Sequence, residues 1–507
     1  MATGSNTQIM PPARANYTGL TFSPDGNYVY FVRIDQATPT IGSLYQTPVL
    51  GGTPKPIAKD VDSPVSFSPD GQRFVFLRMD SAHGVSSLLV ANSDGSGEHP
   101  LVTVMQPSLL QGAPAWSPDG KRISIMRALE KGGIGSLATV DVGGGAIKDF
   151  VPASKIGFVS DSAWLPDGSG LIVSYFNKST RWDRQIGYLA YPSGELRPVT
   201  NDLNHYDASL SATRDAKSLV TVAADQSNNI WVMPGNGSSD QAVQISNGDA
   251  EALQLDWVAN GKIVSEPHSE GFQLDVRAAD GTGKVTIFSD EWPGQALSSC
   301  GDGQHLIFAS IHSGQGENLW RIDSDGNNLT QISQGTLDQY PSCSPDGKWV
   351  VYNSSEGGKQ TVWRVSIDGG TPKQLVEQNS YSPTISADGK FVAFTYGEGS
   401  GTSFHMKLGV ISESGGPLVH SVDLVPVAYG KIRFTPDGQA IAFAGLDEQG
   451  VANLWVQPLN GSSPRKITDF KRDRIFDFGW SPDGKQLALS RGQTARDVVL
   501  LNDTGRQ

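Results

Sequence analysis

A short motif recurs along the whole chain and constrains its fold more than any other feature. Clear copies of aromatic-Ser/Thr-Pro-Asp-Gly are Phe22–Gly26, Phe67–Gly71, Trp116–Gly120, Phe434–Gly438 and Trp480–Gly484. With weaker copies included, the Asp (or Asn) of the motif stands at positions 25, 70, 119, 167, 215, 260, 302, 346, 388, 437 and 483. The spacing of about 46 residues is typical of the blades of a β-propeller.

Each copy is followed by the same order of segments. In Ser-Pro-Asp-Gly, Pro presets φ and Gly supplies a positive φ, which favours a tight turn. An apolar strand follows, as in Trp349–Tyr352, and a third strand comes after a variable loop, as in Thr361–Val365. A second turn at Asp368-Gly369 leads to a fourth strand. Because no segment keeps a helical period, we expect an all-β propeller of about eleven four-stranded blades with almost no helix.

Eleven blades exceed the roughly four to eight that usually form one ring, so we predict two rings. The motif decays between Leu210 and Gly261, which is the natural place for a junction. We therefore expect a first propeller region of about five blades at residues 1–248 and a second of about six blades at residues 249–507.

The two ends of the chain suggest how a ring could close. The last repeat predicts strands near 475–480, 485–490 and 497–502, and no fourth strand follows. Residues 4–10 resemble residues 325–333, a turn with a fourth strand, so we expect them to complete the last blade and cover its edge. The alternative is that the chain simply ends at a blade boundary.

The charge balance excludes several classes of partner. With 39 Lys and Arg against 52 Asp and Glu, the net charge is −13, which argues against binding to nucleic acid or to an anionic membrane surface. No apolar run approaches the ~18 residues of a membrane span, and the N-terminus does not read as a signal peptide. We expect a chain that does not insert into a membrane, cytoplasmic if complete and periplasmic if it is a fragment of a membrane-anchored parent.

The repeat resembles the TolB-type, WD40-like PD40 propeller repeat, in which aromatic-Ser-Pro-Asp-Gly-Lys precedes a strand, Leu-Trp and Asp-Gly. The resemblance covers residues 4–502. Gly19–Gly26 and Leu454–Leu459 are also similar to the C-terminal propeller region of bacterial serine/threonine kinases and winged-helix regulators. That resemblance implies a sensor or interaction module. The sequence holds no Gly-rich kinase loop, no His-Arg-Asp loop and no Gly-x-Ser-x-Gly elbow, so neither kinase nor hydrolase activity is implied.

The residues that could bind a metal or cofactor are better explained by structural roles. One Asp per repeat is expected to bond neighbouring backbone N–H groups, and the eight His residues show no zinc-ligand spacing. Ala278–Lys284 departs from a P-loop. We therefore predict no metal and no cofactor. Cys300 and Cys343 lie at nearly matching repeat positions of adjacent blades, which we expect to be more than ~7 Å apart, so we predict two free thiols.

Candidate binding residues lie in the connections that differ from blade to blade. Both repeated turns fall on one face, so the variable loops gather on the other face around the channel mouth. Exposed aromatic residues beside Arg are typical of binding surfaces. The candidates are Tyr175, Arg181, Trp182, Arg184, His205, Tyr206, Trp292, Tyr340, Arg472 and Arg474. The alternative for each is that it packs the edge of a blade.

These features favour a non-enzymatic propeller scaffold that binds a protein, a peptide or a small ligand on its variable-loop face. A rival hypothesis is a propeller enzyme, lyase or glycosidase-like, with its site at the channel mouth. Three or more Asp, Glu, His or Arg side chains meeting within ~6 Å in a pocket with perturbed pKa values would favour the enzyme. A third possibility is a purely architectural spacer with a featureless variable face.

Overall fold

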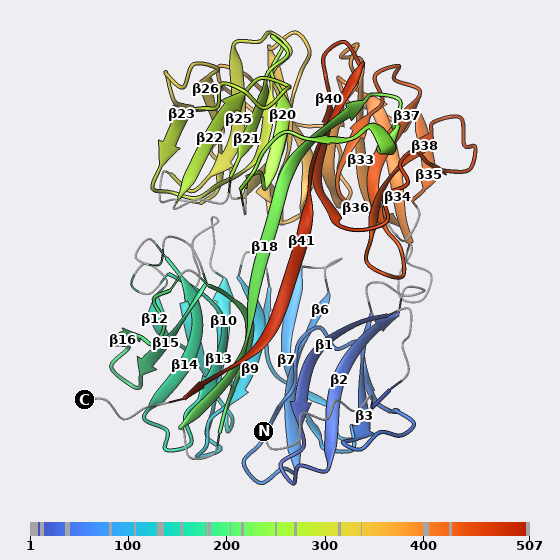
Figure 1. Cartoon of the computed structure of the whole chain (residues 1–507). Coiled ribbons are helices and arrows are strands. Elements are labelled where there is room, and N and C mark those ends of the chain that lie inside the picture. Colours follow the sequence, from blue (N-terminus) through green and yellow to red (C-terminus); the bar gives the residue numbers. More distant parts are fainter. Residues whose placement is uncertain are drawn as a thin grey trace. The chain divides into compact units, whose positions relative to one another are not determined.

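The computed structural model is a chain of antiparallel β-sheets, nine with four strands and one with five in the described residues. Figure 1 shows them in sequence colours. The described residues are 9–10, 15–35, 41–80, 84–105, 108–128, 136–152, 155, 157–177, 180, 184–202, 204–213, 217–248, 251–267, 271–312, 316–335, 337–398, 405–424 and 428–502. The all-β propeller fold and the near absence of helix are confirmed.

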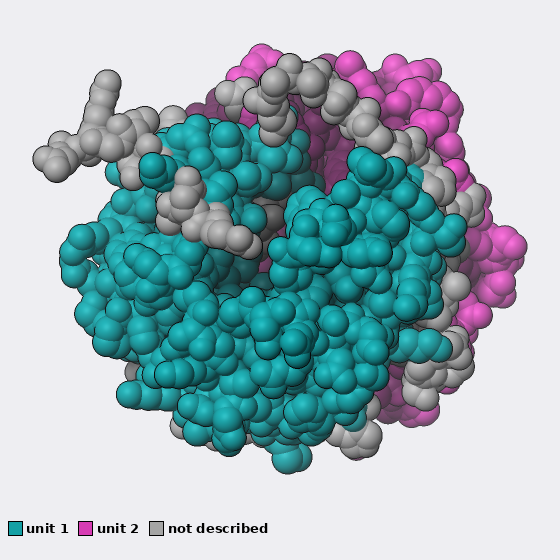
Figure 2. Space-filling view, turned by 90° about the horizontal axis from the view of Figure 1, so that it is seen from below, with its two compact units in different colours: residues 1–224, 400–404, 496–507 teal, residues 225–399, 405–495 magenta. Residues whose placement is uncertain are grey.

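The chain divides into two compact units. Unit 1 holds residues 1–224, 400–404 and 496–507, and unit 2 holds residues 225–399 and 405–495. Figure 2 colours the two units separately. Residues 225–248, which the sequence analysis assigned to the first ring, lie in unit 2.

Four complete blades of unit 1 follow one another in sequence, and each contains four strands. Their strands are β1 (Ala15–Phe22), β2 (Tyr28–Asp35), β3 (Gly42–Pro48) and β4 (Lys55–Lys59); β5 (Ser66–Phe67), β6 (Arg73–Asp80), β7 (Val85–Asn92) and β8 (His99–Met105); β9 (Leu109–Trp116), β10 (Arg122–Ala128), β11 (Ser136–Asp141) and β12 (Ile147–Pro152); β13 (Phe158–Trp164), β14 (Gly170–Phe176), β15 (Gln185–Ala190) and β16 (Leu196–Pro198).

Five complete blades of unit 2 likewise follow one another, each with four strands. Their strands are β20 (Gln254–Trp257), β21 (Ile263–Glu266), β22 (Phe272–Arg277) and β23 (Val285–Asp290); β24 (Gly294–Ser299), β25 (His305–Ser310), β26 (Asn318–Asp323) and β27 (Thr330–Gln331); β28 (Asp338–Cys343), β29 (Trp349–Ser354), β30 (Thr361–Ser366) and β31 (Lys373–Gln374); β32 (Ser380–Ile385), β33 (Phe391–Glu398), β34 (His405–Ser412) and β35 (His420–Asp423); β36 (Ala428–Phe434), β37 (Ala440–Leu446), β38 (Ala452–Pro458) and β39 (Arg465–Lys466). Two 3-10 helices, Ser239–Gln241 and Glu356–Gly358, lie in the loops of this unit.

The remaining sheet supplies one blade to each unit. Its strands are β17 (His205–Ala212), β18 (Ser218–Pro234), β19 (Val243–Gln244), β40 (Arg474–Trp480) and β41 (Gln486–Asn502). The order is β17-β18-β41-β40, so the two long strands β18 and β41 lie side by side (Figure 1). β17 pairs only with the part of β18 in unit 1, whereas β19 and β40 pair with the parts of β18 and β41 in unit 2. Unit 1 therefore has five blades and unit 2 has six.

The end of the chain differs from the prediction. Separate strands were predicted at 485–490 and 497–502, but both belong to the uninterrupted strand β41. Gly492 lies between the two predicted strands but does not form a turn. A Cβ at this position would lie 1.8 Å from the carbonyl oxygen of Ser227. This glycine lets β41 approach β18 closely. Of residues 4–10, predicted to complete the last blade, residues 4–8 lie outside the described residues. Ile9 lies beside Gly51 of the first blade, where a Cβ would be 3.2 Å from the Ile9 carbonyl oxygen.

The repeated turn has the chemistry expected from the sequence. In the copy before β29, the Ser344 hydroxyl donates to the Asp346 carboxylate at 2.7 Å, which also accepts the N–H of Lys348 at 3.2 Å. Gly347 has φ of 67°. In the copy before β41, these bonds from Ser481 and the N–H of Lys485 lower the pKa of Asp483 to about 2. The repeated Asp residues are turn residues.

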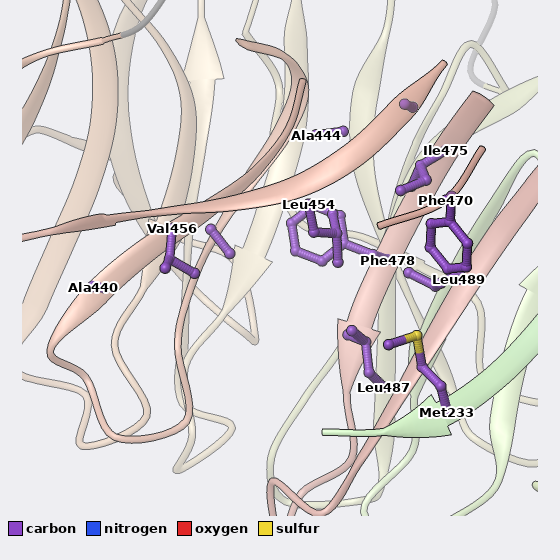
Figure 3. Packing of buried hydrophobic residues seen from close by; sticks show 12 residues of the cluster. Met233, Ala440, Ala444, Leu454, Val456, Phe470, Ile475, Phe478, Leu487 and Leu489 are labelled. Carbon is purple, nitrogen blue, oxygen red and sulfur yellow. The ribbon is translucent and has the colours of Figure 1, made fainter. Parts of the chain in front are cut away.

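Apolar cores form between neighbouring blades rather than within one large centre. One of them joins the blade of β36–β39 to the blade formed by β40, β41 and β18. Figure 3 shows Leu454 of the former beside Phe478 of the latter, and Leu487 near Met233; Val456 belongs to the same cluster. Because side chains alternate in direction along a strand, each blade packs one face against the preceding blade and the other face against the following blade.

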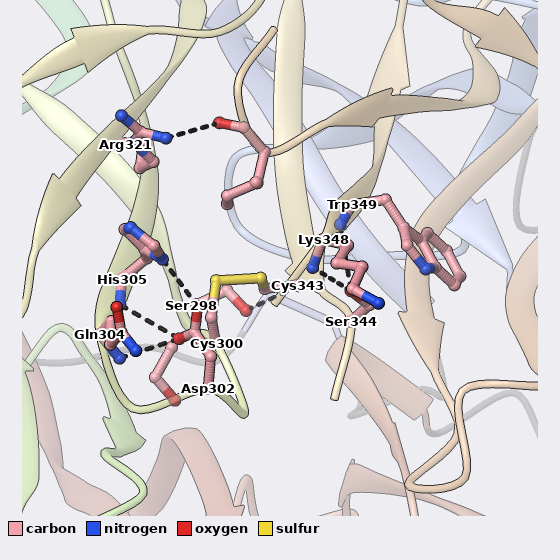
Figure 4. The surroundings of a disulfide bond; sticks show 12 residues. Ser298, Cys300, Asp302, Gln304, His305, Arg321, Cys343, Ser344, Lys348 and Trp349 are labelled. Carbon is pink, nitrogen blue, oxygen red and sulfur yellow. Dashed lines mark hydrogen bonds and ion pairs between the residues drawn. A yellow bond between two sulfur atoms is a disulfide. The ribbon is translucent and has the colours of Figure 1, made fainter. Parts of the chain in front are cut away.

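The prediction of two free thiols is wrong, because Cys300 and Cys343 form a disulfide with 5.0 Å between their Cα atoms (Figure 4). Cys300 follows β24 and Cys343 ends β28, the inner strands of adjacent blades. Inner strands lie near the axis of a propeller, where neighbouring blades converge. The Cα–Cα distance that we expected between equivalent positions of neighbouring blades was therefore too large for positions so close to the axis.

Candidate functional site

The inner strands of unit 2 surround its axis. β20, β24, β28, β32, β36 and β40 each pack against the next, and β40 packs against β20, which closes the ring. Each inner strand begins at the variable-loop end and ends at the repeated turn. Residues near the start of these strands are therefore the ones that can form a site on the variable-loop face.

Four consecutive inner strands carry a β-bulge near their start, which the repeat pattern did not predict. The shifts lie between Gln295 and Ser298, Gln339 and Ser342, Tyr381 and Thr384, and Tyr429 and Ile432. The bulged segments hold residues with positive φ: Ala296 (61°), Tyr340 (52°), Ser382 (52°) and Gly430 (72°). Non-glycine residues in this region are strained and cluster at functional sites. The one signal in the sequence was Gly430, a glycine inside a predicted strand.

A small pocket of about 30 Å³ lies among these bulges. Its lining comes from four inner strands and comprises Leu297, Ser298, Tyr340, Pro341, Ser342, Ser382, Pro383, Thr384, Lys431, Ile432 and Arg433. Ser298 and Ser342 accept hydrogen bonds from the backbone N–H of Cys343 (3.2 Å) and Ile385 (3.3 Å) of the next blade. These hydroxyls hold neighbouring blades together.

Two basic residues of β36 reach acidic residues of other blades. Lys431 Nζ lies 3.0 Å from Asp477 of β40 and donates to the carbonyl oxygen of Leu297 in β24 at 3.1 Å. Arg433 lies 3.3 Å from Asp256 of β20. Asp256 and Asp477 also accept backbone N–H groups of the blades that follow them. The network ties four blades together near the axis and neutralises its own charges.

A buried carboxyl group lies beside this network. Glu266 of β21 is 6% exposed, and its Oε2 atom has no hydrogen-bond partner within the described residues. Burial raises its pKa to about 8; Lys431 acts in the opposite direction and Asp477 in the same direction. Glu266 is therefore mostly protonated at neutral pH, because ionisation would leave an unpaired charge in the interior.

The start of the inner strands carries polar and aromatic groups. The side-chain amides of Gln295 and Gln339 donate to the two carboxylate oxygens of Glu317, whose pKa is raised by burial. Tyr340 and Tyr381 are each 37% exposed on neighbouring strands. Burial raises the pKa of both phenols, so they are neutral donors at physiological pH. Their rings offer partly exposed aromatic surface on a rigid frame.

The predicted site residues are distributed over both units. In unit 1, the guanidinium of Arg184 lies over the ring of Phe176 at 5.7 Å, and the backbone N–H of Arg184 donates to His205 Nδ1 at 3.5 Å. Tyr175 and Tyr206 are 1% and 3% exposed and belong to the cores of their blades.

The other predicted residues belong to unit 2 or cannot be placed. Trp292 precedes β24 and is half-buried, and Tyr340 lines the axial pocket. Arg472 has a 77% exposed side chain in the loop before β40, and Arg474 begins that strand. Arg181 and Trp182 lie outside the described residues. Missing from the prediction were Lys431, Arg433 and Glu266, because single charges inside a strand do not reveal that several blades bring them together.

Among the residues described, no group of three or more His, Cys, Asp and Glu side chains could hold a metal ion. The same residues include no helix long and apolar enough to cross a membrane.

Comparison with known proteins identifies the repeat. Residues 291–419, from the loop before β24 to the residue before β35, match the PD40 family, described as a TolB beta propeller domain. The expected TolB-type propeller repeat is confirmed.

Curated relatives match over limited lengths. Tol-Pal system protein TolB of Francisella tularensis subsp. tularensis is 27% identical over 186 residues, 36% of this chain and 42% of the relative. Uncharacterized protein YidR of Escherichia coli is 38% identical over 66 residues, 13% of this chain and 16% of the relative. The chain thus spans less than half the length of these relatives. The solved structure of TolB from Acinetobacter baumannii is 14% identical, with a TM-score of 0.38, and the match covers 77% of this chain and 82% of that one.

Proposed function

We propose that this chain is a non-enzymatic scaffold that binds a peptide segment of a protein partner at the variable-loop end of the axis of unit 2. The TolB-type propeller fold suggests an interaction scaffold. The observation that carries the proposal is the pair of partly exposed tyrosines, Tyr340 and Tyr381, on neighbouring bulged strands beside the axial pocket. Tyrosine in a rigid setting offers a large contact area at low entropic cost and is enriched among interface hot spots.

The surroundings of the tyrosines fit a peptide better than a substrate. The pocket that Tyr340 lines, about 30 Å³, is far smaller than the roughly 300–1,000 Å³ of a small-molecule site. Glu317 and the two glutamines bonded to it add polar groups at the same end. A peptide laid across the start of the inner strands could use both sets of groups without entering the axis.

The rival enzyme hypothesis is favoured by one observation. Arg433, Asp256 and Asp477 meet at the axis, and the nearby Glu266 has a strongly raised pKa. Such a group satisfies the criterion set out for a propeller enzyme. However, both aspartates are paired with the basic residues of β36 and accept backbone N–H groups, as expected of a structural network. The interaction scaffold is therefore the preferred function.

The test is a selection of peptides from a displayed random library on the full chain. Selected peptides should bind Tyr340→Ala/Tyr381→Ala at least about tenfold more weakly, because truncated hot spots each cost about 1 kcal/mol or more. Tyr28→Ala, which removes a tyrosine of similar exposure (39%) next to a repeated turn in unit 1, should leave binding unchanged. Equal binding to the wild type and the double variant would reject this site.

A further inference from the structure

The fifth blade of unit 1 lacks a fourth strand. Its strands are β17, the first half of β18 and the last half of β41. β40 pairs with β41 only as far as Gly492. Among the described residues, no strand pairs with the outer edge of β41 from 496 to 502. The other ten blades each have four strands, so this edge exposes backbone N–H and C=O groups where the rest of the molecule has a ladder.

The side chains of this half of β41 alternate in direction. Val499 and Leu501 pack against the core shared with the fourth blade. Val498 and Leu500 point to the opposite face and are 72% and 53% exposed, and Val220 of the adjacent β18 is 36% exposed. The face that would meet the next blade of a closed ring is therefore apolar and open.

The other end of the five-blade arc is also apolar and exposed. Leu20 and Phe22 of β1 are 65% and 58% exposed, although β1 is the inner strand of the first blade. Described apolar residues form no core between the first and fifth blades, whereas each other pair of neighbours in unit 1 shares one. Both ends of the arc thus present uncovered apolar surface.

We propose that the free edge of β41 in unit 1 is a docking site for an extended segment of a partner protein, which adds as the missing fourth strand. The unpaired edge requires an extended backbone, because only a strand can complete the ladder. The alternation of Val498 and Leu500 requires apolar side chains at every second position of that segment. The exposed charges Arg496 and Asp497 offset each other at this edge, so the net charge of −13 is what favours flanking lysines in the partner segment.

This site is independent of the one at the axis of unit 2. All strands of the described residues already pair within their own sheets, so the added strand has to come from elsewhere. Segments outside the described residues and a second copy of the chain are the competing occupants, and the test has to separate them from a partner strand.

The experiment uses a fluorescent peptide in which valine and threonine alternate between two terminal lysines. Its anisotropy on titration with the full chain should show saturable binding. Val498→Asp/Leu500→Asp should weaken this binding by at least about tenfold, since two charges replace the apolar contacts of the added strand. Both side chains are largely exposed, so the variant should fold. Met105→Asp, at a 65% exposed position that ends the fourth strand β8, is the matched control and should bind like the wild type.

Amide hydrogen exchange gives a second readout on the wild-type chain. The peptide should slow exchange at residues 497–501 and leave β8 unchanged. The proposal is overturned if the peptide fails to bind, or binds the double variant as well as the wild type. It is also overturned if deletion of residues 1–8 speeds exchange at 497–501 in the free chain, which would make the N-terminal segment the occupant. A dimer in sedimentation that the double variant abolishes would instead identify a second copy.

Discussion

The two units are built from the same repeat but differ in closure. In unit 2, six apolar cores join six blades, and the core that closes the ring forms between the blade of β18, β40 and β41 and the blade of β20–β23. In unit 1, five blades share four described cores, and the core next to β17 has only three buried members, Ile186, Tyr206 and Leu219. The repeat therefore encodes a blade and its packing on the next blade, but not the closing of a ring.

Closure in unit 2 depends on features outside the repeat. Trp480 donates from its indole N–H to the carbonyl oxygen of Gly235 at 2.9 Å, which joins β40 to the end of β18. Asp477 accepts the backbone N–H of Leu255 at 3.2 Å, which joins the last blade to the first. Both bonds connect residues more than 200 positions apart. Unit 1 has no such closing contacts among its described residues, so we expect it to unfold first.

The largest effect is expected from truncation of a core in the closed ring. Phe308, 1% exposed, packs on Phe272 with 4.5 Å between ring centroids. Phe308→Ala should destabilise unit 2 by about 3–5 kcal/mol, and Leu219→Ala should destabilise unit 1 by about 2–3 kcal/mol. In denaturant, followed by amide exchange, each variant should shift only the transition of its own unit. A single transition that moves with either substitution would contradict independent closure.

Loss of the disulfide comes next. Cys300 and Cys343 are 43 residues apart and connect adjacent blades of unit 2. Cys300→Ser/Cys343→Ser should lower the stability of unit 2 by about 4 kcal/mol, because the unfolded chain regains loop entropy. Reductant should have the same effect on the wild type and none on the double variant. Since the chain has no other cysteine, the transition of unit 1 is the internal control. Two titratable thiols in denaturant without reductant would disprove the bond.

The smallest effect concerns pH and again distinguishes the units. Glu266 has a pKa of about 8 in the folded chain, against 4.5 for the ordinary carboxyl group. Between about pH 5 and 8 the folded state therefore binds more protons than the unfolded state, and the stability of unit 2 falls as pH rises. The fall should reach about 2 kcal/mol between pH 6 and 8 and level off above that. Glu266→Gln should remove it. A slope that survives the substitution would assign the pH dependence to other groups.

The sequence predicted local structure well, because a turn is specified by adjacent residues. Ser344, Asp346 and Gly347 form the expected turn, and the spacing of such turns predicted eleven blades. Features that depend on distances between blades were missed. The bulge at Tyr340 has no marker in its own sequence, and the reach between Cys300 and Cys343 depends on how close each lies to the axis.

The candidate site was predicted only in part, for a related reason. Tyr340 was among the predicted residues because an aromatic residue in a variable segment is conspicuous, and it lines the axial pocket. Tyr175 and Tyr206 satisfied the same criterion but are buried, because tyrosine occurs both in exposed loops and in the cores of blades. Lys431 and Arg433 stand at inner-strand positions, and their acidic partners Asp477 and Asp256 belong to other repeats, 46 and 177 positions away.

The path of β18 and β41 also constrains the order of events during synthesis on the ribosome. The Ser218 hydroxyl in β18 donates to Asn502 in β41 at 2.7 Å, and the two residues are 284 positions apart. The fifth blade of unit 1 cannot gain this strand until all of unit 2 has been translated, which at about 5–20 residues per second takes many seconds. Its nascent edge is exposed throughout that interval. A chaperone bound to that edge, or a circular permutant that begins at residue 486, would shorten the exposure and raise the yield of folded protein.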